Sequence, residues 1–223
     1  MRCKEGGKVA NHMQICLGVL ILSLTANGQD VAANSKFTNT LGMLFVSINK
    51  SNTVMLGLHE VRQRDWVAIM TNNPSWKTNL EAPVELIDYV TAVKFCELLS
   101  RKEGVVYRLP TSAEWISRVE KDKKGILHKG TLPVFQCPTN VFGFWGMEGN
   151  VQEWCSDFED RDTSRDGFRS TGRYRRVMGQ SYMHFGSAYF NTSTDNWLPE
   201  AGVCNGSLGI RLVLEKATKG ETK

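Results

Sequence analysis

The first part of the chain shows strand-like and then helix-like hydrophobic patterns. Residues 37–48 form a near-continuous apolar run rich in strand-forming residues, which predicts a buried strand. After a turn-like segment, the apolar residues at 54–58 can pair with that run as a hairpin. The next apolar residues recur at helical spacing, at Trp66, Ile69 and Met70. We therefore predict a strand pair followed by a helix that ends before Pro74.

A second helix is predicted from signals at both of its ends. Asp88 is placed to cap its start, and Gly104 is placed to stop it. Its predicted buried face carries apolar residues at the i, i+3, i+4 and i+7 positions, which are Ala92, Phe95, Cys96 and Leu99. This pattern makes Cys96 a thiol of the core.

A third helix is predicted to start at a capping box formed by Thr111 and Glu114, in which each side chain satisfies a free backbone N–H of the first turn. Arg108 precedes the box on a short strand, and Trp115 begins the buried face of the helix. Because capping explains both Thr111 and Glu114, neither residue needs a catalytic role.

Residues 140–157 combine aromatic residues, glycines and acids in one short stretch. Glycine permits backbone conformations closed to other residues, whereas the aromatic side chains require burial. We therefore predict a tight, buried loop whose backbone and carboxylate oxygens converge. Such a loop suits a ligand or metal site, and it equally suits a corner of the core with satisfied polar groups.

The remaining patterns are strand-like at 177–183, polar and loop-like at 187–205, and strand-like again at 209–214. Strands and helices do not alternate regularly enough for a βαβ fold. We predict an α+β domain that is rich in irregular structure.

Composition and charge narrow the class of protein. A hydrophobic content of 41% in 223 residues supports an ordinary globular core. The net charge of +4 is mild, and no stripe of Lys and Arg is interleaved with stacking aromatic residues. A nucleic-acid partner is therefore not expected.

The N-terminus is typical of an export signal, with basic residues before an apolar run at 15–24 and small residues before Gln29. The run is too short to span a bilayer comfortably, and no later stretch is long enough, so the mature chain is predicted to have no membrane span. We expect an exported protein, whether periplasmic, cell-surface or secreted. Its predicted parts are a signal peptide (1–28), a flexible lead-in (29–36), one domain (37–214) and a solvated tail (215–223).

After removal of the signal the chain keeps four cysteines, an even number that suits one or two disulfides in an oxidising compartment. Their connectivity stays open. The absence of a Cys-x-x-Cys spacing argues against a thiol redox motif or a structural zinc site. The four cysteines are Cys96, Cys137, Cys155 and Cys204.

Several blocks, taken in order, give the chain a family likeness. They include Arg-Leu-Pro-Thr at 108–111, Gly-Asn-Val-Gln-Glu-Trp at 149–154 and Gly-Ile-Arg at 209–211. With these blocks the chain resembles the formylglycine-generating enzymes, or sulfatase-modifying factors, over residues 37–214. The resemblance implies a single domain of C-type-lectin-like architecture, with Arg211 and the Trp154 region in the core of one site.

The resemblance also bears on copper. The best-known members oxidise a cysteine of exported sulfatases to formylglycine, using two cysteines that bind copper(I), a metal suited to soft thiolates. Without gaps, these two positions fall near Tyr189 and Thr194, and no cysteine lies between Cys155 and Cys204. We therefore expect no copper and no catalytic cysteine pair.

Calcium is implied in part. The family binds it through the Gly-Asn-Val-x-Glu loop, which would supply Gly149, Val151 and Glu153 as ligands here. The Asp or Asn expected three residues before Gly149 is Gly146, so the implied site is weakened, with Glu148 as a conceivable substitute. A buried Glu153 held by backbone N–H groups is the other interpretation.

These observations predict a binding or accessory module without copper chemistry, whose partner is an exported protein or peptide, or a glycan. The alternative is a divergent formylglycine-generating oxidase or a related oxygen-dependent enzyme. The predicted binding surface consists of polar and aromatic residues, and their alternative role is packing. They are Tyr182, His184, Tyr189, Asn191, Trp197 and Arg211.

Overall fold

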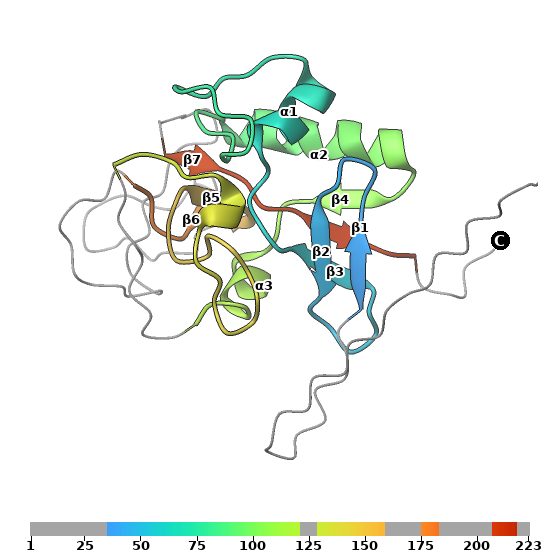
Figure 1. Cartoon of the computed structure of the whole chain (residues 1–223). Helices are drawn as coiled ribbons and strands as arrows, with labels where there is room; N and C mark the ends of the chain where they lie inside the picture. Colours follow the sequence, from blue (N-terminus) through green and yellow to red (C-terminus); the bar gives the residue numbers. More distant parts are fainter. Residues whose placement is uncertain (1–34, 121–128, 159–174, 183–206, 218–223) are drawn as a thin grey trace, which may run out of the picture. The chain divides into compact units, whose positions relative to one another are not determined.

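Two β-sheets and three α-helices make up the described part of the chain (Figure 1). The computed structural model describes residues 35–120, 129–158, 175–182 and 207–217, all of which belong to one compact unit, Ala33–Lys223. The strands are β1 (Lys36–Thr38), β2 (Leu44–Ser47), β3 (Val54–Gly57), β4 (Val106–Arg108), β5 (Gln152–Phe158), β6 (Arg175–Met178), β7 (Leu208–Gly209) and β8 (Val213–Glu215). The helices are α1 (Gln63–Met70), α2 (Tyr89–Glu103), α3 (Ser112–Ile116) and the 3-10 helix η1 (Val134–Gln136).

The larger sheet has five strands in the order β1-β2-β3-β8-β4, and each neighbouring pair is antiparallel. The predicted hairpin is confirmed as β2 and β3, in which Phe45 pairs with Gly57. The prediction of one strand over 37–48 is wrong, because the chain turns between β1 and β2. In this turn Asn39 Oδ1 accepts the N–H groups of Leu41 and Met43, and Gly42 has a φ of +76°.

The helical predictions for α1 and α2 are confirmed. The Asp88 side chain accepts the N–H of Thr91 at 2.6 Å, and α2 ends at Gly104 in a left-handed conformation. Helices α1 and α2 pack together (Figure 1), and the rings of Trp66 and Phe95 stack with centroids 5.0 Å apart. As predicted, Cys96 lies on the buried face of α2.

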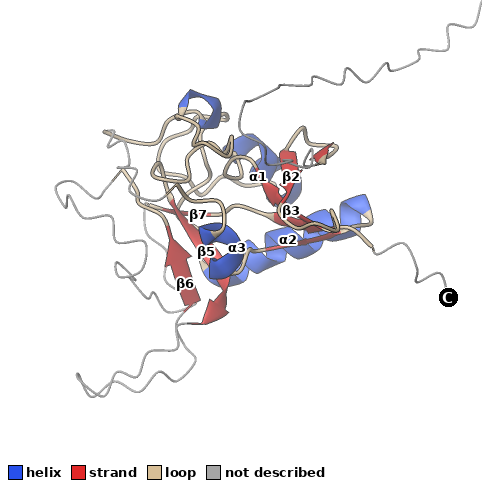
Figure 2. Ribbon diagram, turned by 90° about the horizontal axis from the view of Figure 1, so that it is seen from below, coloured by secondary structure: helices blue, strands red, loops and turns tan. Residues whose placement is uncertain are grey.

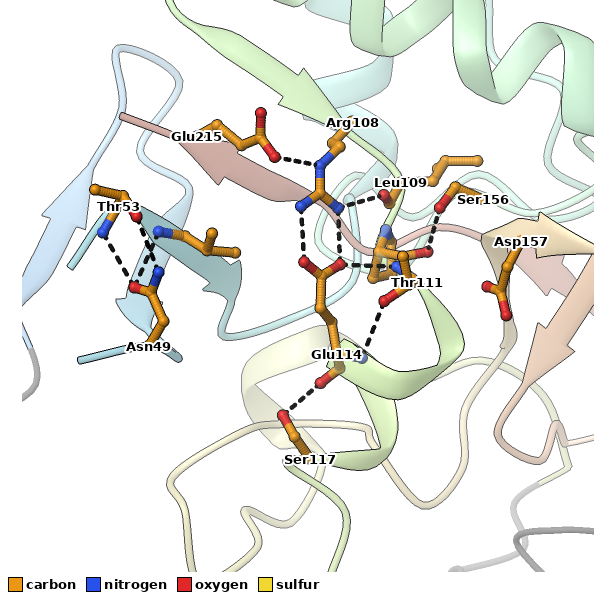
Figure 3. A network of polar contacts seen from close by, with 12 residues as sticks. Asn49, Thr53, Arg108, Leu109, Thr111, Glu114, Ser117, Ser156, Asp157 and Glu215 are labelled. Carbon is orange, nitrogen blue, oxygen red and sulfur yellow. Dashed lines mark hydrogen bonds and ion pairs between the residues drawn. The ribbon is translucent and has the colours of Figure 1, made fainter. Parts of the chain in front are cut away.

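The capping box at the start of α3 is confirmed and belongs to a wider polar network (Figure 3). The Arg108 guanidinium donates to both carboxylate oxygens of Glu114 at 2.7 Å, while its Nε donates to Glu215 at 2.7 Å. Glu114 also accepts the backbone N–H of Thr111 at 2.8 Å. This network ties β4, β8 and α3 together.

The smaller sheet has the order β6-β5-β7, with β5 antiparallel to β6 and parallel to β7. The predicted buried loop therefore extends only to residue 151, because residues 152–158 form the central strand of this sheet. Figure 2 shows α3 beside β5, in agreement with the contacts between the two elements.

The predicted closing strand over 209–214 is in fact two strands, β7 and β8, which belong to different sheets. The segment that links them carries Ile210 and Leu212 into the main hydrophobic core and Arg211 between the strands. Within the described residues, no helix is long and apolar enough to cross a membrane.

Candidate functional site

A buried ion pair joins Arg211, between β7 and β8, to Glu153 of β5, beside the buried loop at 140–151, which we call the glycine-rich loop. Arg211 Nη2 lies 2.8 Å from Glu153 Oε1, and Arg211 Nε lies 3.0 Å from Glu153 Oε2. The Trp115 indole N–H also donates to Glu153 Oε2 at 2.6 Å. The remaining guanidinium donors reach the carbonyl oxygens of Gly57 at 3.0 Å and Trp145 at 2.8 Å. The pair and its hydrogen bonds therefore link β3, α3, β5 and the glycine-rich loop.

Arg211 is fully buried, with 0% of its surface exposed, so its predicted place on a binding surface is wrong. Arginine is rarely buried unless it is paired with a carboxylate, and the sequence pattern alone does not show which carboxylate lies nearby. The implication that Arg211 and the Trp154 region meet in one core agrees with the structure, because Glu153 directly precedes Trp154.

Glu60 is a second buried carboxylate next to this pair, with 0% of its surface exposed. Among the described residues, neither of its oxygens has a well-aligned hydrogen-bond partner, although an interaction with the Asn150 side chain favours the ionised form. Burial raises the pKa of Glu60 from 4.5 to about 7, against the opposing attraction of Arg211. Gly146 makes room for this carboxylate, since a Cβ there would lie 2.4 Å from Glu60 Oε1.

The residues around Glu153 do not fit the implied calcium site. Both oxygens of Glu153 already accept hydrogen bonds from Arg211 and Trp115, whereas calcium requires several free oxygen ligands. The other interpretation, a buried Glu153, agrees with the structure, but its donors among the described residues are side chains and not backbone N–H groups. Glu148 Oε1 accepts a hydrogen bond from Asn140 at 3.2 Å. Among the described residues, no cluster of three or more His, Cys, Asp or Glu side chains is arranged to hold a metal ion.

The described cysteines are all buried, and Cys96 and Cys155 belong to the apolar core. Cys96, Cys137 and Cys155 are buried thiols outside any disulfide. Burial raises the pKa of Cys96 to about 12, and it also raises the pKa values of Cys137 and Cys155. Neutral buried thiols are poor nucleophiles and poor metal ligands. Cys204 lies outside the described residues.

Of the other residues predicted for the binding surface, the structure describes only Tyr182, which is half-buried in a turn after β6. His184, Tyr189, Asn191 and Trp197 lie outside the described residues, as does Thr194. Tyr182 lines a cavity of about 420 Å³, which we call the Trp76 cavity. The cavity is lined by Trp76, Lys77, Glu85, Leu86, Lys129, Gly130, Thr131 and Tyr182.

A buried acid lies at the wall of the Trp76 cavity. Glu85 is 2% exposed, and its carboxylate interacts with the Tyr182 hydroxyl and the backbone N–H of Trp76. Its Oε2 has no hydrogen-bond partner among the described residues. Burial raises the pKa of Glu85, and burial together with this carboxylate raises the pKa of Tyr182 to about 12.

Sequence reasoning missed Trp76, Lys77, Glu85 and Lys129 as site residues. One local signal was present, because Glu85 interrupts the otherwise apolar stretch at 82–87. The convergence itself depends on the tertiary fold, which brings the segments near residues 76, 85, 130 and 182 to one cavity.

The sequence matches one family model and is similar to several known proteins. The family model for the sulfatase-modifying factor enzyme 1-like domain matches residues 25–120 and 119–216. The chain is 24% identical to the chaperone protein LppX of Paenibacillus barcinonensis, over 45% of this chain and 60% of that protein. It is 33% identical to the serine/threonine-protein kinase pkn1 of Chlamydia caviae over 25% of this chain and only 11% of that protein.

Solved structures share the fold. Treponema denticola variable protein 1 superposes with a TM-score of 0.61 at 21% identity, covering 82% of this chain and 92% of that chain. PvdO from Pseudomonas aeruginosa gives 0.64 at 15% identity, covering 82% and 99%. These likenesses confirm the predicted α+β, C-type-lectin-like fold.

Proposed function

Because the chain belongs to the sulfatase-modifying factor enzyme 1-like domain family, we propose that it is an exported binding or accessory module of that family without formylglycine-generating activity. The observation that carries the proposal is the Trp76 cavity, whose described lining residues offer aromatic, cationic and carboxylate groups but no thiol. A concave site with a few placed polar groups is the usual form of a ligand pocket.

The distribution of cysteines supports the same proposal. Copper(I)-dependent oxidation of a substrate cysteine by oxygen needs two thiolates that bind the metal, and the sequence has no cysteine between Cys155 and Cys204. Cys96 and Cys155 are held in the core as neutral thiols, each enclosed by its own apolar neighbours. Neither can reach a substrate without local unfolding of the core.

An accessory role is consistent with the name of one relative. LppX of Paenibacillus barcinonensis is called a chaperone, and it aligns with 45% of this chain. The predicted signal peptide would carry the chain to the compartment where an exported protein, peptide or glycan is met.

Copper binding and oxidation test the proposal against the enzyme alternative. The purified chain is titrated with copper(I) under a competing chelator and then given oxygen and a sulfatase-type cysteine peptide. We expect neither stoichiometric copper nor an aldehyde in the peptide mass spectrum. One equivalent of copper together with peptide aldehyde would establish a divergent oxidase and overturn the proposal.

Export is tested separately by expressing the full chain and determining the mass of the protein outside the cytoplasm. We expect a mature chain that begins at Gln29. A full-length chain confined to the cytoplasmic fraction would contradict the export part of the proposal.

A further inference from the structure

We infer that the Trp76 cavity binds an acidic sugar, that is, a pyranose ring that carries a carboxylate. This inference rests on the proposed binding function and specifies its ligand. Three features of the cavity carry it: an incompletely paired buried carboxylate, two lysine ammonium groups and an exposed indole ring.

Glu85 calls for a ligand with hydrogen-bond donors. Its side chain is almost fully buried, and its Oε2 has no partner among the described residues. A buried carboxylate oxygen without a partner is costly, so a ligand that donates an O–H or N–H there gains binding free energy. An apolar ligand would leave this oxygen unsatisfied.

Lys77 and Lys129 call for a ligand with a negative group. Both residues line the cavity with exposed side chains, and among the described lining residues Glu85 is the only acid. The two ammonium groups outweigh this one carboxylate, so a simple cation is disfavoured and a ligand of net negative charge is favoured. A hydroxyl group is then the better donor to Glu85 than an ammonium group.

Trp76 calls for a ligand with a flat apolar face. Its side chain is 79% exposed, the largest exposed fraction among the large hydrophobic residues of the described chain. An exposed indole at the edge of a cavity marks a place where binding would bury apolar surface. The C–H face of a pyranose ring supplies such a surface, while its hydroxyl groups point outward from the edge of the ring.

The volume of the cavity agrees with this class of ligand. A cavity of about 420 Å³ lies in the range for small-molecule sites and accommodates one or two sugar rings. Hydroxyl groups, a carboxylate and an apolar ring face occur together in a uronic acid, and each has a counterpart in the lining.

The test compares two probes that differ only at C6, methyl β-D-glucuronide and methyl β-D-glucoside. Binding is followed by titrating the tryptophan indole N–H resonances of the full mature chain, with the Trp76 resonance assigned from Trp76→Phe. We expect the glucuronide to shift the Trp76 resonance at concentrations about tenfold lower than the glucoside requires, as for the loss of one charge-assisted contact.

Three variants locate the interaction. Lys129→Ala should weaken glucuronide binding about tenfold while leaving glucoside binding unchanged. Trp76→Ala should abolish the binding of both sugars, measured by saturation transfer to the probe; this side chain is exposed, so the fold should survive. Lys94→Ala, which removes an exposed lysine of α2 outside the cavity, should change neither affinity.

Equal affinity for the two sugars, or no binding of either, would overturn the inference. Binding of a zwitterion such as L-leucine at the Trp76 resonance while the glucuronide is silent would also overturn it, yet would leave the proposed binding function standing. The proposed function fails on a different readout, the formation of peptide aldehyde with copper.

Discussion

Arg211 and Glu153, 58 residues apart in the sequence, meet in the core with 2.8 Å between Nη2 and Oε1. Both side chains are almost completely buried, at 0% and 1% exposure. The sequence blocks at 149–154 and 209–211 therefore contact each other through this ion pair. Each charged group depends on the other for its burial.

We predict that Arg211→Met lowers the free energy of unfolding by about 3–5 kcal/mol, because it leaves the Glu153 carboxylate buried without its cation. Urea unfolding followed by circular dichroism measures the change. Arg108→Met is the control, since Arg108 pairs with Glu114 and Glu215 at sites that are 28%, 21% and 42% exposed. The control should cost about 1 kcal/mol; equal costs for the two variants would contradict the prediction.

We predict that calcium raises the melting temperature only slightly, because Arg211 and Trp115 already occupy the oxygens of Glu153. Differential scanning calorimetry with and without millimolar calcium measures the change. A large increase that Glu153→Gln abolishes would reveal a structural calcium site at this residue. The increment on adding calcium is compared within each variant, because the substitution lowers stability by itself.

Gly146→Ala should destabilise the fold more than Gly143→Ala. Both glycines have a positive φ, +71° and +82°, so both substitutions pay the cost of the left-handed conformation. Only at residue 146 does the new Cβ meet another group, the Glu60 carboxylate at 2.4 Å. We expect an additional cost of about 1–3 kcal/mol for Gly146→Ala in chemical denaturation. Equal costs would mean that Glu60 can move away freely.

Glu60 should make stability depend on pH in the direction opposite to an ordinary ion-paired acid. Its folded-state pKa of about 7 lies above the usual 4.5, so the folded chain binds a proton that the unfolded chain releases between these values. Its stabilising contribution is therefore complete below about pH 4.5 and is lost as the pH rises through about 7.

The comparison with Glu60→Gln isolates this effect. Between pH 5 and pH 8, the wild type should lose about 2–3 kcal/mol of unfolding free energy relative to Glu60→Gln. His59 acts in the opposite sense, because burial lowers its pKa to about 3 and its protonation upon unfolding costs stability as the pH falls below 6.5. Both proteins contain His59, so its effect cancels. A constant difference between the two proteins would refute the assignment.

The helix ends could be predicted from the sequence, because capping residues act on the backbone next to them. The ends of α2 follow from Asp88 and Gly104, and the start of α3 follows from Thr111 and Glu114, because each signal acts within a few residues. The turn at Asn39 is not evident from the sequence, because apolar residues lie on both sides of it. The turn depends on hydrogen bonds to a single side chain, that of Asn39.

The candidate site was predictable only in part, because it depends on contacts between distant segments. The position of Tyr182 in the chain predicts a site residue, but its partner Glu85 lies nearly a hundred residues earlier. The burial of Arg211 could not be predicted from the local pattern, because it depends on its ion pair with the distant Glu153.

The division of residues 208–215 between two sheets constrains how the protein is made. Strand β8 lies between β3 and β4, and β7 completes the sheet of β5 and β6. A nascent chain still lacking these residues has a gap in one sheet and an open edge in the other. Both sheets are therefore completed only after residues 208–215 leave the ribosome, and until then the unpaired strand edges are prone to aggregation.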